Sequence, residues 1–383
     1  MSLRVTSLEL RDFRNYPSYK VDDLAVLNVL VGPNAVGKTN LLEALQLLTS
    51  TTSFRNPKNA HLIRIGAEAA FAQAHVEGDG RTLDVSLTVQ DGKRAFNLNG
   101  KRKAPADLRG LVPSVTFSPD DLYLVKGAHA QRRDALDALG SQLSKNYAAV
   151  RNDYQKMVRQ KNRYLKQDAT DDYLVAINEV LATVGAQLYV MRTQLVEEFS
   201  NHLASAYASI SGSKESVRMT YVPSWMKDEW SDDELREAPK LSRSAVRDAL
   251  LEAMSARASR EHERRLSLFG PHADHVNFFI RDLGAQRFAS QGQQRSLVLA
   301  CKLAEVALIE QRLGQLPIML LDDVMSELDE TRRSELMQVI NQGIQVFVTT
   351  TTLDYFTNDV LKQARVVEMR NPSDGGNDTR EAV

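Results

Sequence analysis

The residues with the most recognisable chemistry form one short segment, GPNAVGKT, at positions 32 to 39. It fits GxxxxGK[ST] at every fixed position, and its glycines permit a loop whose backbone N–H groups surround phosphate oxygens at the start of a helix. In such a loop Lys38 holds the β and γ phosphates, and Thr39 is a ligand of Mg²⁺. The rest of the predicted loop consists of Gly32, Pro33, Asn34, Ala35, Val36 and Gly37. A chance glycine turn is the alternative, but an apolar strand pattern before the loop and a helical pattern after it favour binding of ATP with Mg²⁺.

Two adjacent carboxylates follow an apolar run, PIMLL, at residues 317 to 321. A carboxylate at the carboxyl end of a buried strand lies beside the phosphate loop in α/β nucleotide-binding folds. We therefore expect Asp322 to hold the Mg²⁺ shell and Asp323 to orient or deprotonate the attacking water. Taken alone, the pair could also be solvated acids at a strand exit.

A third motif, SQGQQR at 290 to 295, precedes an apolar-periodic helix. Ser290, Gly292 and Gln293 could form an anion site for a γ-phosphate at the helix start, although a serine there is also an ordinary helix cap. The order of the motifs is more informative, because the Asp-Asp strand and SELD, with Ser326 and Asp329, come next. That order is typical of an ATP-binding-cassette ATPase, in which the SxGQ loop of one subunit closes over the ATP of another. It predicts a homodimer with two ATP sites.

The elements around these motifs predict an α/β fold. Residues 25 to 31 read as a strand and 40 to 48 as a helix, while 71 to 98 contain short alternating stretches with hairpin turns at Asp91-Gly92 and Asn99-Gly100. After Gly270 we expect further strands and helices, at 293 to 313, 317 to 321, from 331, at 344 to 350 and at 365 to 369.

Between about 130 and 205 the apolar period is helical, which predicts two long amphipathic helices that reverse at the polar residues 167 to 172. A further helix is expected after Ser242, with Trp225 and Trp230 in the link before it. The expected fold is thus a cassette-type P-loop ATPase lobe with a small antiparallel β subdomain and an inserted α-helical lobe. Its expected divisions are 1–125 (first part of the ATPase lobe), 126–265 (helical lobe), 266–370 (second part of the ATPase lobe) and 371–383 (disordered tail).

Composition limits the alternatives. The net charge of −1 means that any contact with nucleic acid must come from a local patch. The single cysteine, Cys301, excludes an internal disulfide, and the seven histidines lack the spacing of a zinc site. Neither an apolar signal stretch nor a run of 18 apolar residues is found, so we expect a cytoplasmic protein with no membrane partner.

The clearest basic patch is residues 126 to 166, with ten basic and three acidic side chains. Such a helix can bind the DNA backbone without reading its sequence, although a solvated outer face would look the same. A weaker basic group lies at Lys93-Arg94 and 101 to 103. The candidate DNA contacts are Arg151, Lys156, Arg159, Lys161, Arg163 and Lys166.

Several motifs in combination resemble the RecF family, the bacterial recombination-repair branch of the cassette ATPases related to SMC proteins. The motifs are LRDFRNY at 10 to 16, GPNAVGKTNLLEAL at 32 to 45, FSPDDL at 117 to 122, GPH at 270 to 272, SQGQQR at 290 to 295 and LLDDVMSELD at 320 to 329. The resemblance implies an ATP-dependent dimer on single-stranded and gapped duplex DNA, with weak, DNA-stimulated ATP hydrolysis. It also implies work with RecR and RecO to place RecA at gaps, in recombinational repair, replication restart and the SOS response. Similar proteins use a basic residue at the position of Arg14 near the nucleotide, although an ordinary surface arginine is the alternative.

The chain departs from the family pattern after GPH, where Ala273 and His275 replace an arginine and an acidic residue. Unlike many cassette ATPases, but like RecF proteins, it has Asp323 where a glutamate is common and threonines at 349 to 352 where a histidine is common. The alternatives are the nucleotide-binding subunit of a transporter, an SMC-like structural ATPase and a nuclease that carries a cassette ATPase. The FRNY and GPH elements argue against a transporter subunit, which also would not require a basic helical lobe. The helices are too short for the long arms of an SMC-like protein, and a nuclease would need a separate cluster of metal-binding acids, which is not found.

Overall fold

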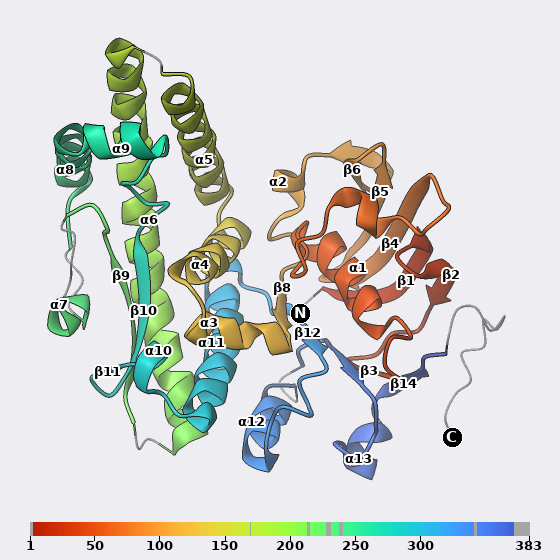
Figure 1. Cartoon of the computed structure of the whole chain (residues 1–383). Helices are drawn as coiled ribbons and strands as arrows, with labels where there is room; N and C mark the ends of the chain where they lie inside the picture. The colour runs from red at the N-terminus through yellow and green to blue at the C-terminus, as the bar shows by residue number, and fades with distance from the viewer. Residues whose placement is uncertain are drawn as a thin grey trace. The chain divides into compact units, whose positions relative to one another are not determined.

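The computed structural model describes residues 3–168, 170–212, 215–226, 231–236, 240–340 and 343–370 (Figure 1). Trp230 and the predicted tail at 371–383 lie outside the described residues. The chain divides into two compact units, the first made of Met1–Asp121 with Glu305–Val383 and the second of Leu122–Ala304. The second unit extends further than the expected helical lobe. It also takes in residues 266 to 304, which were expected in the ATPase lobe.

A parallel five-stranded sheet forms the centre of the first unit, in the order β14-β3-β13-β12-β8. Its three inner strands are apolar runs buried along nearly their whole length, as expected for parallel strands covered on both faces. The four strands predicted for this sheet are confirmed, with bounds that differ by one or two residues: β3 Leu27–Val31, β12 Ile318–Asp322, β13 Val346–Thr350 and β14 Arg365–Glu368. The fifth strand, β8 Ser114–Phe117, was not predicted from the sequence.

The antiparallel sheet of this unit is larger than the small β subdomain predicted from sequence. It has six strands in the order β2-β1-β4-β5-β6-β7, because two N-terminal strands join the hairpins. The turns at Asp91-Gly92 and Asn99-Gly100 have positive φ at both residues, as two-residue hairpin turns require. The strands are β1 Arg4–Phe13, β2 Tyr16–Val21, β4 Ala69–Gly78, β5 Arg81–Gln90, β6 Lys93–Leu98 and β7 Lys101–Lys103.

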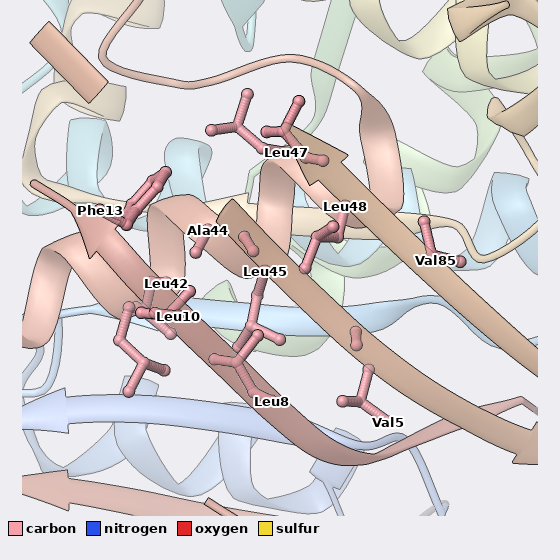
Figure 2. Packing of buried hydrophobic residues seen from close by; sticks show 14 of the residues in the cluster. Val5, Leu8, Leu10, Phe13, Leu42, Ala44, Leu45, Leu47, Leu48 and Val85 are labelled. Carbon is pink, nitrogen blue, oxygen red and sulfur yellow. The ribbon is translucent and has the colours of Figure 1, made fainter. Parts of the chain in front are cut away.

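The helix that follows the phosphate loop, α1 (Lys38–Ser50), contacts strands of both sheets. Figure 2 shows its buried leucines, among them Leu42 and Leu45, packed with Leu8 and Leu10 of β1. Burying a leucine side chain contributes about 1.5–3 kcal/mol, so this packing holds α1 and the loop before it in a fixed position. The other helices of the unit are η1 Asn59–Leu62, α2 Pro105–Leu108, η2 Pro119–Leu122, α12 Glu330–Ile340 and α13 Asn358–Leu361.

The second unit is built around α6 (Asp171–Ser211), which packs against α5 (Lys145–Lys166) and against α8 (Arg243–Ala256) (Figure 1). The reversal at residues 167 to 172 and the helix start at Ser242 are confirmed. The prediction of two long helices was wrong in its first half, because Ser144 ends α4 (His129–Leu143) and its side chain then caps α5. A capping serine inside an apolar pattern is easily read as one more exposed polar residue.

A three-stranded antiparallel sheet, β11-β10-β9, completes this unit, and β9 packs on α6. By length and composition α6 could also cross a membrane, which is weak evidence because core helices share these properties. Its contacts with α5, α8 and β9 accompany the burial of many of its apolar residues, among them Leu181, Leu188 and Leu203. The remaining elements are β9 Val217–Val222, β10 His275–Ile280, β11 Leu283–Gly284, α3 Tyr123–Lys126, α7 Asp232–Arg236, α9 Ala258–Arg264, α10 Ala285–Phe288 and α11 Gln291–Leu313, the last of which crosses the boundary between the units.

Candidate nucleotide site

The phosphate loop runs from the end of β3 into α1, as the sequence predicts. Two of its glycines are required by close packing. A Cβ on Gly32 would lie 2.5 Å from the backbone oxygen of Met369, and one on Gly37 would lie 2.7 Å from both Asn15 and Tyr16. Gly37 also has a φ of 114°, which side-chain-bearing residues rarely adopt. The backbone can therefore take the course that a phosphate-binding loop needs.

Lys38 is nearly buried and turns into its own loop. Its Nζ donates hydrogen bonds to the backbone oxygens of Gly32 at 2.6 Å and of Pro33 at 2.8 Å. Burial lowers the pKa of Lys38, while Asp323 and Asp322 act in the opposite direction. The ammonium group thus lies where the loop would surround phosphates, and its hydrogen-bond acceptors among the described residues are neutral carbonyl oxygens.

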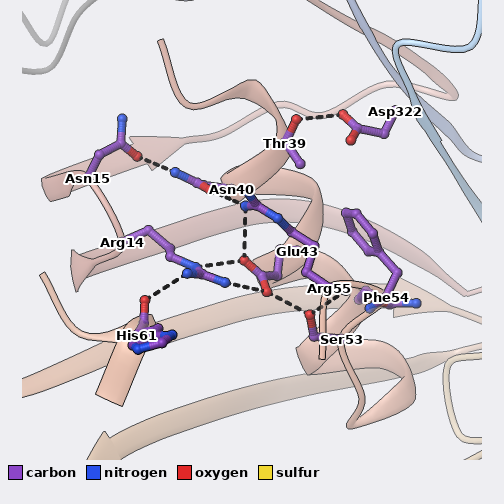
Figure 3. Close-up of polar contacts among 11 residues, drawn as sticks. Arg14, Asn15, Thr39, Asn40, Glu43, Ser53, Phe54, Arg55, His61 and Asp322 are labelled. Atoms are coloured by element: carbon purple, nitrogen blue, oxygen red, sulfur yellow. Dashed lines mark hydrogen bonds and ion pairs between the residues drawn. The ribbon is translucent and has the colours of Figure 1, made fainter. Parts of the chain in front are cut away.

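The carboxylate of Asp322, at the end of β12, contacts the second residue of α1. Thr39 Oγ1 donates to Asp322 Oδ1 at 2.9 Å, although the two residues are 283 positions apart (Figure 3). Burial raises the pKa of Asp322, and hydrogen bonds from Thr39 and Thr349 partly offset this rise. A hydroxyl and a carboxylate oxygen side by side are the hard ligands that Mg²⁺ prefers, so the donor set fits this metal.

A buried carboxylate, Glu43 in the second turn of α1, organises the residues beside the loop (Figure 3). Arg14 binds it with two hydrogen bonds of 2.8 Å and also donates to the backbone oxygen of His61 at 2.9 Å. Ser53 Oγ donates to the same carboxylate at 2.6 Å. Arg14 therefore lies next to the phosphate-loop helix with its guanidinium engaged by Glu43, and its contact with nucleotide stays a prediction.

Arg55 is a charged residue of this region that sequence reasoning missed. Its Nη1 donates to Asn40 Oδ1 at 2.7 Å and lies 3.6 Å from Glu43, and its charge lowers the pKa of Asp322. Asn40 in turn donates to Asn15, whose amide donates to the Val36 backbone oxygen at 3.0 Å. A chain of hydrogen bonds thus connects Arg55 to the phosphate loop itself. The only available signal was that Arg55 follows the end of α1 closely.

The residues of the SQGQQR motif predicted to meet a γ-phosphate, called the signature residues below, are Ser290, Gly292 and Gln293. They belong to the second unit and lie at the start of α11. Ser290 Oγ accepts the Gln293 N–H at 3.2 Å, and Gln293 Oε1 accepts the Ser290 N–H at 2.9 Å, which is a reciprocal cap. The Gln293 side chain also donates to Glu215 at 2.9 Å. The exposed Ser290 hydroxyl is therefore held at a helix N-terminus, the polarity that favours an anion.

The SELD residues form the turn after β12. Ser326 Oγ donates to the backbone oxygen of Asp323 at 3.1 Å, and Asp329 Oδ1 accepts the Arg332 N–H at 3.0 Å at the start of α12. Asp329 therefore acts as a helix cap in this chain. Ser326 connects the turn to the backbone of Asp323.

The basic helix α5 requires one correction. Lys161, predicted to contact DNA, is 1 % exposed and forms a 2.5 Å ion pair with Glu261 of α9, so it cannot reach a ligand phosphate. It follows Tyr154 by seven residues and precedes Leu165 by four, a spacing that puts it on the apolar face. Arg151 is largely covered and lies 3.3 Å from Asp137. Four cations remain exposed, spaced by three, four and three residues along one face of α5: Lys156, Arg159, Arg163 and Lys166.

The loop, the two carboxylates and the α/β architecture define a P-loop ATPase of the ATP-binding-cassette type. The "RecF/RecN/SMC N terminal domain" model matches residues 4–373. The chain belongs to the RecF family of DNA replication and repair proteins.

Similar proteins are found over nearly the whole chain. The DNA replication and repair protein RecF of Lactobacillus johnsonii is 34 % identical over 368 residues, covering 94 % of this chain and 96 % of the relative. That of Synechococcus sp. (strain JA-3-3Ab) is 37 % identical over 369 residues, covering 94 % and 95 %. A solved structure of "the recombination mediator protein RecF-ATP in RecFOR pathway" has a TM-score of 0.84 at 28 % identity, covering 93 % and 94 %. The Smc head domain of Pyrococcus furiosus, at TM-score 0.51, 15 % identity and coverage of 97 % and 94 %, shares the fold.

Proposed function

We propose that this chain is an ATP-driven switch for DNA, in which ATP with Mg²⁺ favours a dimer and slow hydrolysis releases it. The observation that carries the proposal is the 2.9 Å contact between Thr39 and Asp322, since it joins the phosphate loop to the metal-binding carboxylate. Lys38 would hold the β and γ phosphates, and Thr39 and Asp322 would hold Mg²⁺. Asp323 would orient the attacking water and accept its proton.

The dimer follows from the signature residues. The reciprocal cap holds Ser290 and Gln293, with Gly292 between them, at the start of α11, where the exposed Ser290 hydroxyl lies at the positive end of the helix and would face an anion. We place this surface against the γ-phosphate bound to a second copy of the chain. Ser326 and Asp329 lie in the turn that would face the same partner. A γ-phosphate that gains contacts only in the dimer shifts the equilibrium toward association by that differential affinity.

DNA contact is assigned to the exposed face of α5. The four cations Lys156, Arg159, Arg163 and Lys166 form one stripe. Such a stripe contacts phosphates and carries no information about base sequence. Arg151 remains a weaker candidate because of its contact with Asp137.

The names of the relatives support a role in DNA replication and repair, and one solved relative is called a recombination mediator of the RecFOR pathway. By this relationship we propose binding of single-stranded and gapped duplex DNA and weak DNA-stimulated ATPase activity. We also propose cooperation with RecO and RecR in loading RecA, a contribution to the SOS response and action in the cytoplasm. An SMC-like structural ATPase or a transporter subunit would use the same nucleotide chemistry, but neither accounts for the basic stripe on a short helix.

Sedimentation velocity tests the switch. We expect a monomer with ADP, a dimer with ATP, and a more stable dimer with ATP and gapped DNA. Ser290→Arg should bind ATP as a monomer and fail to dimerise, because the added side chain fills the site for the partner's γ-phosphate. Dimers of equal stability with ATP and ADP, or dimers of Ser290→Arg with ATP, would refute the proposal. Enrichment on gapped DNA without strand cleavage separates it from a nuclease, a transporter subunit and a chromosome clamp.

A further inference from the structure

The strand next to the carboxylate strand brings one hydroxyl into contact with both Asp322 and Asp323. In the parallel pairing of β12 with β13, Thr349 lies opposite Asp322. Thr349 is 1 % exposed, and its Oγ1 donates to Asp322 Oδ1 at 2.9 Å. The same oxygen accepts the Asp323 backbone N–H, also at 2.9 Å. One buried side chain therefore contacts both adjacent acids, one through its carboxylate and the other through its backbone.

The contact with Asp323 matters because of that residue's backbone. Asp323 has a φ of 52°, in the left-handed region, directly after the extended strand β12. Aspartate tolerates this region better than most side-chain-bearing residues, and contacts to its backbone select this conformation over the extended one. Thr349 Oγ1 holds its N–H, and Ser326 Oγ donates to its backbone oxygen at 3.1 Å. Together these contacts fix the direction in which the Asp323 side chain leaves the sheet.

The contact with Asp322 differs from the one that Thr39 makes with the same oxygen. Thr39 belongs to the phosphate-loop helix, and its hydroxyl oxygen is the one that would turn toward Mg²⁺. Thr349 belongs to the sheet and does not depend on the nucleotide for its position. It is therefore suited to hold Asp322 in place when the Thr39 hydroxyl turns toward Mg²⁺.

We propose that Thr349 is a positioning residue for ATP hydrolysis: its hydroxyl sets the side-chain direction of Asp323 and the orientation of Asp322. The inference rests on the proposed function, because it assumes that these carboxylates act on Mg²⁺-ATP. It goes further by assigning a role to Thr349, one of the threonines that stand where many cassette ATPases have a histidine.

The test compares substitutions that differ in one hydroxyl. Thr349→Val keeps the shape and removes the hydroxyl, whereas Thr349→Ser keeps the hydroxyl. For Thr349→Val we expect kcat for ATP to fall about 10- to 100-fold, the range that misplaced catalytic groups produce. Affinity for a fluorescent ATP analogue without Mg²⁺ should change less than about 3-fold, because Lys38 and the loop amides are untouched. The Mg²⁺ concentration for half-maximal tightening of analogue binding should rise in Thr349→Val alone, and Thr349→Ser should restore kcat to within about 3-fold of the wild type.

Thr116→Val is the matched control. Thr116 lies on β8, the other neighbour of β12, and is also buried. Among the described residues its hydroxyl has no hydrogen-bond partner, so the same substitution removes no contact. Its kcat and its Mg²⁺ dependence should equal those of the wild type, and its stability should be equal or higher, because an unpaired buried hydroxyl is costly.

Several results would overturn the inference. One is a wild-type kcat and Mg²⁺ dependence in Thr349→Val, and another is a Thr349→Ser protein as slow as Thr349→Val. If Thr349→Val and Thr349→Ala both fail to fold while Thr349→Ser behaves as wild type, the hydroxyl serves stability and not positioning. Absence of ATP binding or hydrolysis in the wild type would instead refute the proposed function, so the two failures are distinguishable.

Discussion

The two units use the same charged residue types in opposite ways. In the second unit Arg192 binds Asp137 through two hydrogen bonds of 2.9 and 2.8 Å, and both side chains are at most 4 % exposed. Tyr147 adds a third donor to Asp137, and Tyr221 accepts from Arg192. In the part of the chain that the structure describes, neither Lys38 nor Asp322 of the first unit forms an ion pair, and their hydrogen-bond partners are neutral.

The carboxyl pKa values express this difference. Burial alone would raise the pKa of Asp137, but Arg192 and Tyr147 more than compensate and the pKa lies below its ordinary value. The pKa of Asp322 is raised, because burial outweighs the two hydroxyl donors. The buried ion pair of Arg192 with Asp137 is therefore structural, because each charge already has its counter-charge. Asp322, a buried carboxylate with uncharged partners, remains available to a cation.

The largest effect on stability should come from removing one partner of the buried Arg192–Asp137 ion pair. Arg192→Met leaves Asp137 buried without its main counter-charge, and we expect the free energy of unfolding to fall by about 3–5 kcal/mol. Urea unfolding followed by tryptophan fluorescence measures this, since both tryptophans of the sequence fall between residues 122 and 304. Arg247→Met, which breaks an exposed pair with Glu179, is the control and should cost less than about 1 kcal/mol. An equal loss of unfolding free energy in the two variants would contradict the distinction between buried and exposed ion pairs.

In the nucleotide site, by contrast, loss of a carboxylate charge should affect chemistry and spare the fold. Asp323→Asn should bind ATP but lose hydrolysis by about 100-fold or more, because an amide cannot accept the proton. Its dimers should persist longer on gapped DNA after an ATP pulse than those of the wild type. Asp322→Asn should instead bind Mg²⁺-ATP weakly and accumulate no dimer. Wild-type dimer lifetimes in Asp323→Asn, with hydrolysis abolished, would show that turnover does not drive release.

The basic stripe and the buried lysine of α5 provide a comparison within one helix. Replacing Lys156, Arg159, Arg163 and Lys166 by alanine should reduce the slope of log affinity against log salt by about 3 to 4 units if all four contact phosphate. Lys161→Met should leave this slope unchanged and lower stability, because it leaves Glu261 buried without its cation. An unchanged slope in the fourfold variant would show that the stripe is a solvated surface.

The smallest effect is a pH dependence of the second unit. Burial lowers the pKa of His272 to about 4, and its Nδ1 accepts from Tyr154 while its Nε2 donates to the Ser267 backbone oxygen. Between pH 6.5 and 4 the unfolded chain binds a proton at this histidine that the folded chain does not, so stability falls as pH falls, by about 1–2 kcal/mol at pH 5. Burial raises the pKa of Asp274, which acts in the opposite direction.

The comparison of the wild type with His272→Gln isolates the histidine from Asp274. Urea unfolding of both proteins at pH 7 and pH 5 should give a larger loss for the wild type. The same loss in both proteins would contradict the assignment to His272.

Much of the fold could be predicted from the chain because its signals are local. Hairpin turns need residues that tolerate positive φ, so Asp91-Gly92 and Asn99-Gly100 mark their own positions. Apolar runs without alternation identify the parallel strands, and the capping residue Ser242 marks the start of α8. The break at Ser144 was missed because the apolar period continues through it, and only packing showed that α4 and α5 are separate helices.

The sequence by itself determined the phosphate loop, the carboxylate pair and their order along the chain, because each requires particular residue types at fixed local spacing. The tertiary structure decided which partners the remaining residues meet. Lys161 forms a buried ion pair with Glu261, 100 residues away. The register of β12 with β13 puts Thr349 opposite Asp322. Helical or strand periodicity gives the direction of a side chain relative to its own element, but not the element that packs there. For this reason a lysine predicted to contact DNA forms a core ion pair, and Thr349 contacts the carboxylate of Asp322 and the backbone of Asp323.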